Sequence, residues 1–305
     1  MYYRYQVSRM TRPIRRISRR AALVTLAGAA AAIAAPVRAA PPTSSSNVSG
    51  GRLKQSFCRW PYARTALPEV CRRAKQIGFT AIDLLYPEEW PVARDAGLTV
   101  SMGYASRREK FIATGFNDPA NHPMLLGELT TAIPLAADAH VPNVIAMFGN
   151  RVSGIDDAAA IANCAAGLSK IAPLAEKHGI NICVELLNSK VDHAGYQGDR
   201  TAFGVAVAKG VNSPRVKLLY DIYHMQIMEG DVIRTVRDNI SWIGHFHTGG
   251  VPGRHEINGS QELNYRAIAT AIADLNFPGY VAHEFVPTRS DPFESLTEAY
   301  QLCAV

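Results

Sequence analysis

The sequence predicts an α/β fold, an eight-stranded parallel (β/α)₈ barrel, and three observations support this. Apolar runs typical of strands buried on both faces alternate with helical stretches through residues 53–305. Eight such pairs fit this length, because one βα unit of an eight-fold barrel takes about 30 residues. The 305 residues are 48% hydrophobic, which is ample for one large core. An open, doubly wound sheet is the alternative, but no G-x-G-x-x-G turn follows the first strand.

The expected strands and helices follow one another in regular alternation. The expected strands are 53–58, 80–85, 98–104, 143–149, 181–187, 216–222, 240–248 and 279–285. The expected helices are 66–77, 88–96, 121–140, 156–178, 200–210, 230–238, 264–275 and 291–303. Asp156 and Asp231 precede helical runs, so we expect them to cap those helices. Gly78, Gly97 and Gly179 follow helical runs and are expected to end them.

Residues 1–40 have the parts of an export signal. They hold eight Arg and no Lys, Asp or Glu, and an apolar stretch, 21–35, is followed by small residues suited to cleavage. The segment 18–23, SRRAAL, resembles a twin-arginine signal. The apolar stretch is too short for a stable membrane span, which needs about 20 residues. We therefore expect an export signal over 1–40, a flexible linker over 41–52, and a periplasmic or extracellular protein. A basic arm and an uncleaved anchor are the alternatives.

The rest of the chain is close to neutral. Removing the eight Arg of the leader from 32 basic residues leaves 24, against 26 acidic residues. This balance gives no reason to expect nucleic acid as a partner. A small-molecule substrate is the expected partner, and a homo-oligomer is compatible with the composition. The five Cys show no C-x-x-C spacing, and we assign no disulfide.

Four neighbouring strands of the predicted barrel each end in a side chain able to bind a metal. These residues are Glu185, Asp221, His247 and Glu284, at successive spacings of 36, 26 and 37 residues. The carboxyl ends of barrel strands meet at one face, where active sites of this fold lie. A charged group in a core strand is costly unless it is paired or bound to a metal. We therefore predict one shared metal site, with ordinary ion pairing as the alternative.

Three carboxylates and one imidazole form an oxygen-rich donor set. Such a set favours Mg²⁺ or Mn²⁺, with Co²⁺ as a further candidate, over a structural Zn²⁺. Two open positions on the metal would hold a carbonyl oxygen and the neighbouring hydroxyl, which makes the shared α-proton acidic. One Glu would remove this proton and the other would return it. The expected reaction is an aldose–ketose shift or an epimerisation through an enediolate.

Other side chains near these strand ends have two interpretations each. His245 shares the strand face of His247 and is expected to support it or to compete with it. Arg254, in a Gly-rich loop, is a candidate substrate clamp or a solvated side chain. His224 would bind a substrate oxygen or cap a turn. Trp60 would form an apolar wall over the substrate or merely pack. His283 is expected to be structural.

Several motifs together resemble one enzyme family. The run YDIYHMQIMEGD at 220–231, with GHFH, VPGRHE, ELNY and HEFVP after it, resembles the hydroxypyruvate isomerases. These belong to the xylose isomerase-like TIM barrels, together with the ketose 3-epimerases. The resemblance implies Glu185 and Glu284 as the acid/base pair, with Asp221 and His247 completing the metal shell. It also implies His224, Arg254 and Glu256 near the substrate.

The chain departs from the isomerase pattern at identifiable positions. His247 stands where hydroxypyruvate isomerases have Gln and the 3-epimerases have His. Val191 stands where the 3-epimerases carry Glu. The segment 116–119 replaces a basic segment of the isomerases. We expect a hydroxypyruvate isomerase-type enzyme, with a ketose 3-epimerase or a non-catalytic sugar-binding barrel as alternatives. A metal-dependent phosphodiesterase would require more His at strand ends.

Overall fold

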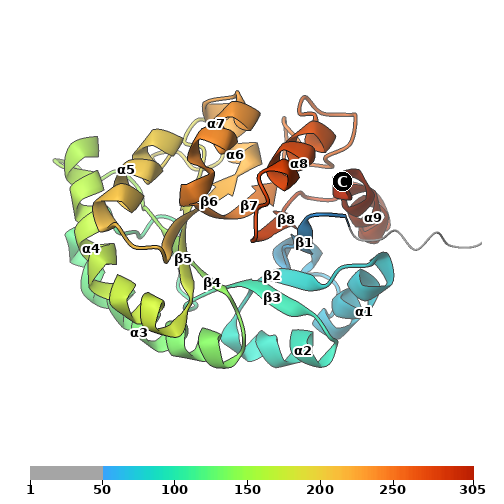
Figure 1. Cartoon of the computed structure of the whole chain (residues 1–305), viewed down its shortest axis with the longest axis horizontal. Coiled ribbons are helices and arrows are strands. Elements are labelled where there is room, and N and C mark those ends of the chain that lie inside the picture. The colour runs from blue at the N-terminus through green and yellow to red at the C-terminus, as the bar shows by residue number, and fades with distance from the viewer. Residues whose placement is uncertain (1–50) are drawn as a thin grey trace, which may run out of the picture. The chain divides into compact units, whose positions relative to one another are not determined.

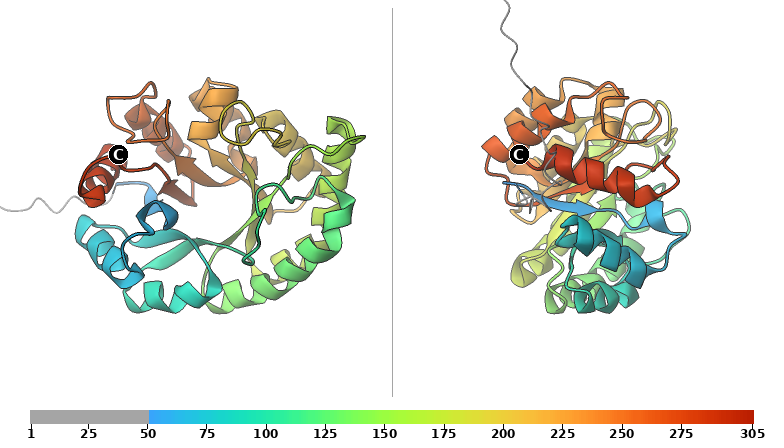
Figure 2. Two further views of the ribbon diagram at one scale, coloured as in Figure 1. Left: turned by 180° about the vertical axis from the view of Figure 1, so that it is seen from behind. Right: turned by 90° about the vertical axis from the view of Figure 1, so that its right-hand side faces the viewer.

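The computed structural model describes residues 51–305 (Figure 1). The expected export signal and most of the expected linker lie outside the described residues. Eight parallel strands form one sheet in the order β1-β8-β7-β6-β5-β4-β3-β2. A parallel bridge between Cys58 and Asp83 joins β1 to β2, so the sheet closes on itself. Helices surround the strands on the outside (Figures 1 and 2). The predicted barrel is therefore confirmed.

The described residues contain every strand and helix expected from the sequence. The strands are β1 Lys54–Phe57, β2 Ala81–Leu85, β3 Thr99–Gly103, β4 Asn143–Met147, β5 Asn181–Leu186, β6 Val216–Asp221, β7 Ile243–Thr248 and β8 Tyr280–His283. The α-helices are α1 Leu67–Ile77, α2 Trp90–Asp95, α3 His122–Asp138, α4 Asp157–His178, α5 Thr201–Val211, α6 Ile222–Met228, α7 Val232–Asn239, α8 Tyr265–Asp274 and α9 Pro292–Cys303.

Two local features differ from the expectation. Helix α6 was not expected as a separate element; it begins because Asp221 Oδ1 accepts a hydrogen bond from the backbone N–H of His224. The expected cap at Asp231 was wrong. Its side chain makes no capping hydrogen bond and instead pairs with Arg234. Asp156 does cap α4, by accepting from the backbone N–H of Ala159 at 2.8 Å.

The packing of helix α4 explains its apolar composition. Among the described residues it is the one helix long and apolar enough to cross a membrane, judged by length and composition. Its apolar face is buried, and Leu168 is fully buried in the hydrophobic core. The five cysteines are free and buried.

His283 is a buried structural residue of β8. Its Nδ1 lies 3.0 Å from Thr248 Oγ1 and its Nε2 lies 3.0 Å from Gln55 Oε1. Burial lowers the pKa of His283 to about 3, so the imidazole is neutral at pH 7. The side chain therefore stabilises the barrel as a neutral hydrogen-bonding group, as expected from the sequence.

We predict that His283 makes the protein less stable in mild acid. The unfolded chain binds a proton at this imidazole near pH 6.5, whereas the folded chain binds it only near pH 3. Its contribution is complete above about pH 6.5 and declines as the pH falls towards 3. Between pH 7 and 4.5 the wild type should lose about 3 kcal/mol more unfolding free energy than His283→Gln. Urea unfolding at both pH values measures this, and equal losses would contradict it.

Candidate active site

The structure brings the four predicted metal ligands together. Glu185 is the penultimate residue of β5, Asp221 ends β6, His247 lies in β7 and Glu284 directly follows β8. One donor atom from each residue lies within 4.8 Å of the others. Asp221 and His247 are fully buried, and both glutamates are only 5% exposed. The register of the parallel strands explains this, because Asp221 pairs directly with His247 across β6 and β7.

The protonation of His247 shows that this cluster suits a cation. Its Nε2 lies 2.9 Å from Asp83 Oδ2, and a carboxylate only accepts, so Nε2 carries the proton. Its Nδ1 lies 2.6 Å from Glu284 Oε2 and 3.3 Å from Glu185 Oε1, yet forms no hydrogen bond. Burial lowers the pKa of His247, but the negative groups around it outweigh burial and raise that pKa well above its usual value. Without an ion the ring itself therefore carries a positive charge between two carboxylates, and a metal bound at Nδ1 would take the place of that proton. A positive charge is needed at this point, and a divalent ion supplies it with donors that such ions prefer.

The electrostatics of the site lead to the same conclusion. Burial raises the pKa of Asp221 to about 7, although Arg254 opposes the shift. Burial also raises the pKa of Glu185. For Glu284, burial alone would raise the pKa, but the positive charges of His247 and Arg254 outweigh it and hold the pKa well below its usual range. Three buried carboxylates against one Arg leave an excess of negative charge, which a divalent cation would offset.

Three further predicted residues also reach the cluster. Arg254 donates from one guanidinium nitrogen to Asp221 Oδ2 at 3.1 Å and to Glu284 Oε2 at 2.6 Å. Trp60 donates its indole N–H to Glu284 Oε1 at 2.7 Å. His224 lies over the cluster with Nε2 3.5 Å from Asp221 Oδ2. These contacts place Arg254, Trp60 and His224 at the carboxyl ends of the strands.

Glu256 is not among the residues that the structure gathers here. Its carboxylate accepts from the Thr288 backbone N–H at 2.7 Å, the Thr288 hydroxyl at 2.9 Å and the Ser295 hydroxyl at 2.7 Å. These contacts tie the loop after β7 to the segment before α9 and to α9 itself. The loop turns sharply at Arg254, whose φ is +59°, so neighbouring side chains diverge. Arg254 enters the site, whereas Glu256 fastens the loop.

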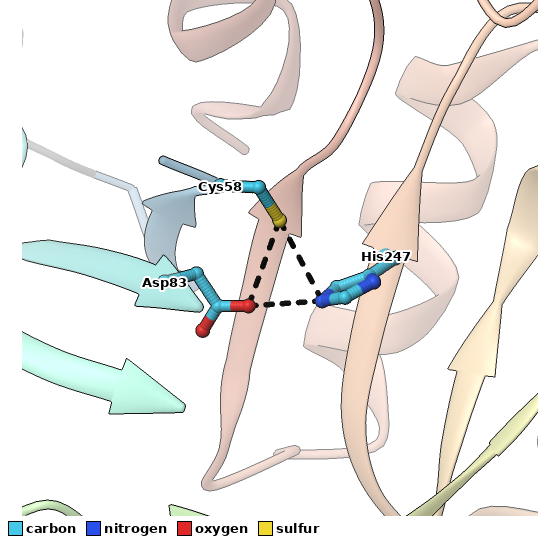
Figure 3. A group of neighbouring side chains, drawn as sticks. All are labelled: Cys58, Asp83 and His247. Atoms are coloured by element: carbon cyan, nitrogen blue, oxygen red, sulfur yellow. Dashed lines mark hydrogen bonds and ion pairs between the residues drawn. The ribbon is translucent and has the colours of Figure 1, made fainter. Parts of the chain in front are cut away.

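Sequence reasoning missed a group of residues behind His247. Asp83 of β2 is fully buried, and its carboxylate accepts from His247 Nε2 and from the Cys58 thiol (Figure 3). It also accepts from the Ser101 hydroxyl. His245 Nε2 also lies 3.2 Å from Asp83 Oδ1, so His245 supports the cluster from behind. The sequence does contain a signal for Asp83, because it is a carboxylate inside the apolar run AIDLL. Asp83 lies in the middle of its strand, so the pattern of strand-end residues did not indicate it.

A cavity of about 310 Å³ opens onto this cluster. Glu185, Glu284 and Arg254 form its polar part. The remainder of its wall is largely apolar and aromatic: Trp60, Leu84, Tyr104, Phe111, Ile112, Ile145, Met147 and Leu187, with His193 at the edge. A concave, mostly apolar site with a few convergent polar groups is the usual form of a small-molecule site.

Comparison with known proteins identifies the family. The family model described as "Xylose isomerase-like TIM barrel" matches residues 71–301. The chain belongs to the xylose isomerase-like TIM barrel family. This xylose isomerase-like barrel is 30% identical to a 2-oxo-tetronate isomerase of Cupriavidus necator over 221 residues, 69% of this chain and 83% of that protein. It is 27% identical to a putative hydroxypyruvate isomerase of Homo sapiens over 248 residues, 76% of this chain and 88% of that protein.

A ketose 3-epimerase of known structure has a similar fold. The crystal structure of a D-psicose 3-epimerase in the presence of D-fructose matches with a TM-score of 0.62 and 20% identity. The match covers 83% of this chain and 97% of that one, and shows the shared fold. The predicted relationship to the isomerases is therefore confirmed at the level of the family, and the epimerase shares the fold.

Proposed function

We propose that this xylose isomerase-like barrel is a metal-dependent isomerase of the hydroxypyruvate isomerase type. It interconverts a small hydroxy-carbonyl compound or sugar through an enediolate. The observation that carries the proposal is the position of two buried glutamates beside one imidazole nitrogen. Glu185 and Glu284 both line the cavity, and both approach His247 Nδ1. Two carboxylates at one reacting centre suit the removal and return of a proton.

The metal would be Mg²⁺ or Mn²⁺, with Co²⁺ as a further candidate, and Glu185, Asp221, His247 and Glu284 would hold it. When bound, a divalent ion polarises a substrate carbonyl and makes the adjacent C–H acidic. Glu185, whose pKa is raised by burial, is suited to take and return the α-proton. Glu284 completes the transfer at the neighbouring carbon, held in place by the Trp60 indole N–H.

His224 is set to donate a hydrogen bond to a substrate oxygen. Its Nδ1 lies 2.6 Å from the Asn188 amide nitrogen, which donates to it, so Nε2 carries the proton. That Nε2 is buried and has no hydrogen-bond partner among the described residues. Burial lowers the pKa of His224 well below its usual value, so the ring is neutral. An unpaired, buried donor beside Asp221 is costly unless a ligand oxygen satisfies it.

A ketose 3-epimerase is the second candidate. His247 favours it, because the 3-epimerases have His at the corresponding position. Val191 disfavours it. This residue stands where the epimerases carry a carboxylate, and it is 67% exposed and outside the cavity wall. Analysis of the product distinguishes the two candidates, since an epimerase keeps the carbonyl in place and inverts one carbon.

Solvent deuterium exchange tests the proposal directly. Metal-loaded protein is incubated in D₂O with a panel of hydroxy-carbonyl compounds, among them hydroxypyruvate, aldoses and ketoses, and exchange of the α-proton is followed by NMR. We expect metal-dependent exchange for at least one compound. Binding of a sugar without any exchange across the panel would instead support a non-catalytic barrel.

We also propose that the protein is exported by the twin-arginine route to the periplasm or beyond. The Arg-rich, then apolar, composition of residues 1–40 supports this. Fractionation of cells that express the full chain, beside a variant with both Arg19→Lys and Arg20→Lys, tests it. Retention of the variant with the signal uncleaved is the expected result, and equal export of both proteins would contradict it.

A further inference from the structure

A second cavity continues the first outward. It measures about 510 Å³ and shares Tyr104, Phe111, Ile112 and His193 with the 310 Å³ cavity at the metal cluster. We call these the outer and inner cavities. A three-carbon substrate occupies only part of the inner cavity, whose volume equals that of about ten waters. The shared side chains place the outer cavity directly beside the inner one, where a second part of a ligand would lie.

The charges around the inner cavity favour an uncharged ligand. Glu185, Asp221 and Glu284 carry −3, Arg254 adds +1, and a divalent ion brings the sum to zero. Arg254 is the one Lys or Arg in the wall of the inner cavity, and two carboxylates already pair with it. Arg107 and Arg108, on the adjoining loop after β3, pair with Glu88 and Glu128 instead. A substrate carboxylate against the apolar wall would lose its hydration without gaining a partner.

The wall of the outer cavity includes Lys110 and Asp192, whose carboxylate already accepts from the Asn188 amide and the Tyr223 hydroxyl. Its other polar groups are neutral and lie beside stacked aromatic rings. Tyr86 and Tyr104 stack at 4.5 Å, and Tyr104 meets the edge of Phe111 at 5.3 Å. The Asn150 amide and the His193 ring line this cavity, and within residues 51–305 neither side chain forms a hydrogen bond. Burial lowers the pKa of His193, which keeps the ring neutral. A neutral amide and a neutral imidazole suit hydroxyl groups.

We propose that the outer cavity is a subsite for a second, uncharged sugar unit, so that the substrate is a glycoside-like carbohydrate rather than a three-carbon acid. This inference rests on the proposed function. The hydroxy-carbonyl part of the substrate lies at Glu185 and Glu284. The attached sugar lies between the loop after β3 and the segment at His193, with its hydroxyls on Asn150 and His193. Lys110 stands exposed at the outer edge.

A matched pair of sugars tests the subsite. Lactulose is a disaccharide with a reducing ketose, and fructose is its ketose alone. Deuterium exchange by the metal-loaded protein should show a KM for lactulose about tenfold below that for fructose, a difference of about 1.4 kcal/mol. Ala194→Trp, which fills the outer cavity, should remove this advantage and leave fructose unchanged. Ala202→Trp, on the outer face of α5, is the control variant.

Other outcomes would overturn the subsite. If lactulose and fructose have equal KM values, and Ala194→Trp changes neither value, the outer cavity is not a subsite. A strong preference for a sugar phosphate that Lys110→Ala abolishes would show an anion site instead. Calorimetry of lactulose binding to wild type and Ala194→Trp tests the subsite even without turnover. Binding that the variant loses, without proton exchange, would retain the subsite and remove the proposed function.

The group behind His247 carries a second, independent inference. Cys58, Asp83 and His247 form a closed triangle, with Sγ 3.6 Å from Asp83 Oδ2 and 3.7 Å from His247 Nε2 (Figure 3). The Asp83 carboxylate is held by the Ser101 hydroxyl and the Cys58 thiol, and it accepts the Nε2 proton of His247. We propose that Asp83 is a positioning residue that fixes the tautomer of His247 and so presents Nδ1 to the metal.

Loss of Asp83 should weaken metal binding without removing a ligand. Asp83→Asn should lower Mn²⁺ affinity about 10–100-fold, measured by calorimetry. Cys58→Ser keeps a donor to Asp83 and is the matched control, with a loss below about fivefold, the worth of one ordinary hydrogen bond. Imidazole ¹⁵N NMR of the Mg²⁺-loaded wild type should show the His247 proton on Nε2. This signature does not depend on the variant folding.

Two results would overturn the role of Asp83. One is a proton on Nδ1, with Nε2 bare, in the Mg²⁺-loaded wild type. The other is an equal loss of affinity in Cys58→Ser together with a thiolate-to-cobalt absorption band in Co²⁺-loaded protein, because that would place the metal on Cys58, Asp83 and His247 Nε2.

Discussion

Replacing Glu185 or Glu284 by glutamine is expected to lower α-proton exchange about 10²–10⁴-fold. An amide has nearly the shape of the carboxylate but neither takes nor returns a proton at neutral pH. Both glutamates are almost fully buried in the cavity wall, so no solvent-exposed group replaces them readily. Rates of deuterium exchange at saturating metal and substrate measure the effect for each variant.

The controls separate proton transfer from metal binding. Glu262→Gln changes an exposed carboxylate after β7 and should exchange at the wild-type rate. Metal content is measured for each variant, because Glu185 and Glu284 are both proposed ligands. A variant that retains its metal and loses exchange identifies a proton-transfer residue. Full exchange in either metal-loaded variant would contradict the proposed acid/base pair.

His247→Ala is expected to lose the bound divalent ion. The wild type should hold one ion per chain, and the ion should stabilise it by about 2.7 kcal/mol at 100 times its Kd. The variant removes the only nitrogen ligand and leaves Glu185, Glu284 and Asp83 without their shared partner. Metal analysis and thermal unfolding with and without a chelator measure both effects.

A histidine elsewhere in the barrel provides the comparison for His247. His178→Ala lies at the end of α4 and should bind metal as the wild type does. Unchanged metal content in His247→Ala would leave the fold intact and remove the proposed metal site. A chelator that leaves the wild-type melting temperature unchanged would argue the same way.

The fold was largely predictable because its information is local and repeated. Each strand is a short apolar run, and each helix ends in a recognisable signal such as Gly78, with φ of +118° at the end of α1. Asp231 shows where this reasoning failed. A short polar residue before a helix can cap it or turn outward, and Arg234 one turn later attracts the carboxylate outward.

The four residues of the candidate metal cluster were predictable because they lie at or near strand ends. Parallel strands in a barrel point their carboxyl ends to one face, so residues far apart in sequence must meet there. Glu256 could not be placed by the same logic. It lies in a loop whose path depends on Thr288 and Ser295, and no periodicity in the sequence encodes that contact.

The sequence by itself determined the barrel, the four metal-competent strand ends and the likeness to sugar isomerases. It did so because the apolar runs, and the polar residues at or near the ends of the last four strands, are features of the local sequence. Only the tertiary structure decided that Asp83 of β2 stands behind His247 of β7, that Arg254 rather than Glu256 enters the site, and that a second cavity adjoins the first. These arrangements depend on contacts between segments 30 to about 160 residues apart, and such contacts form only when the barrel closes.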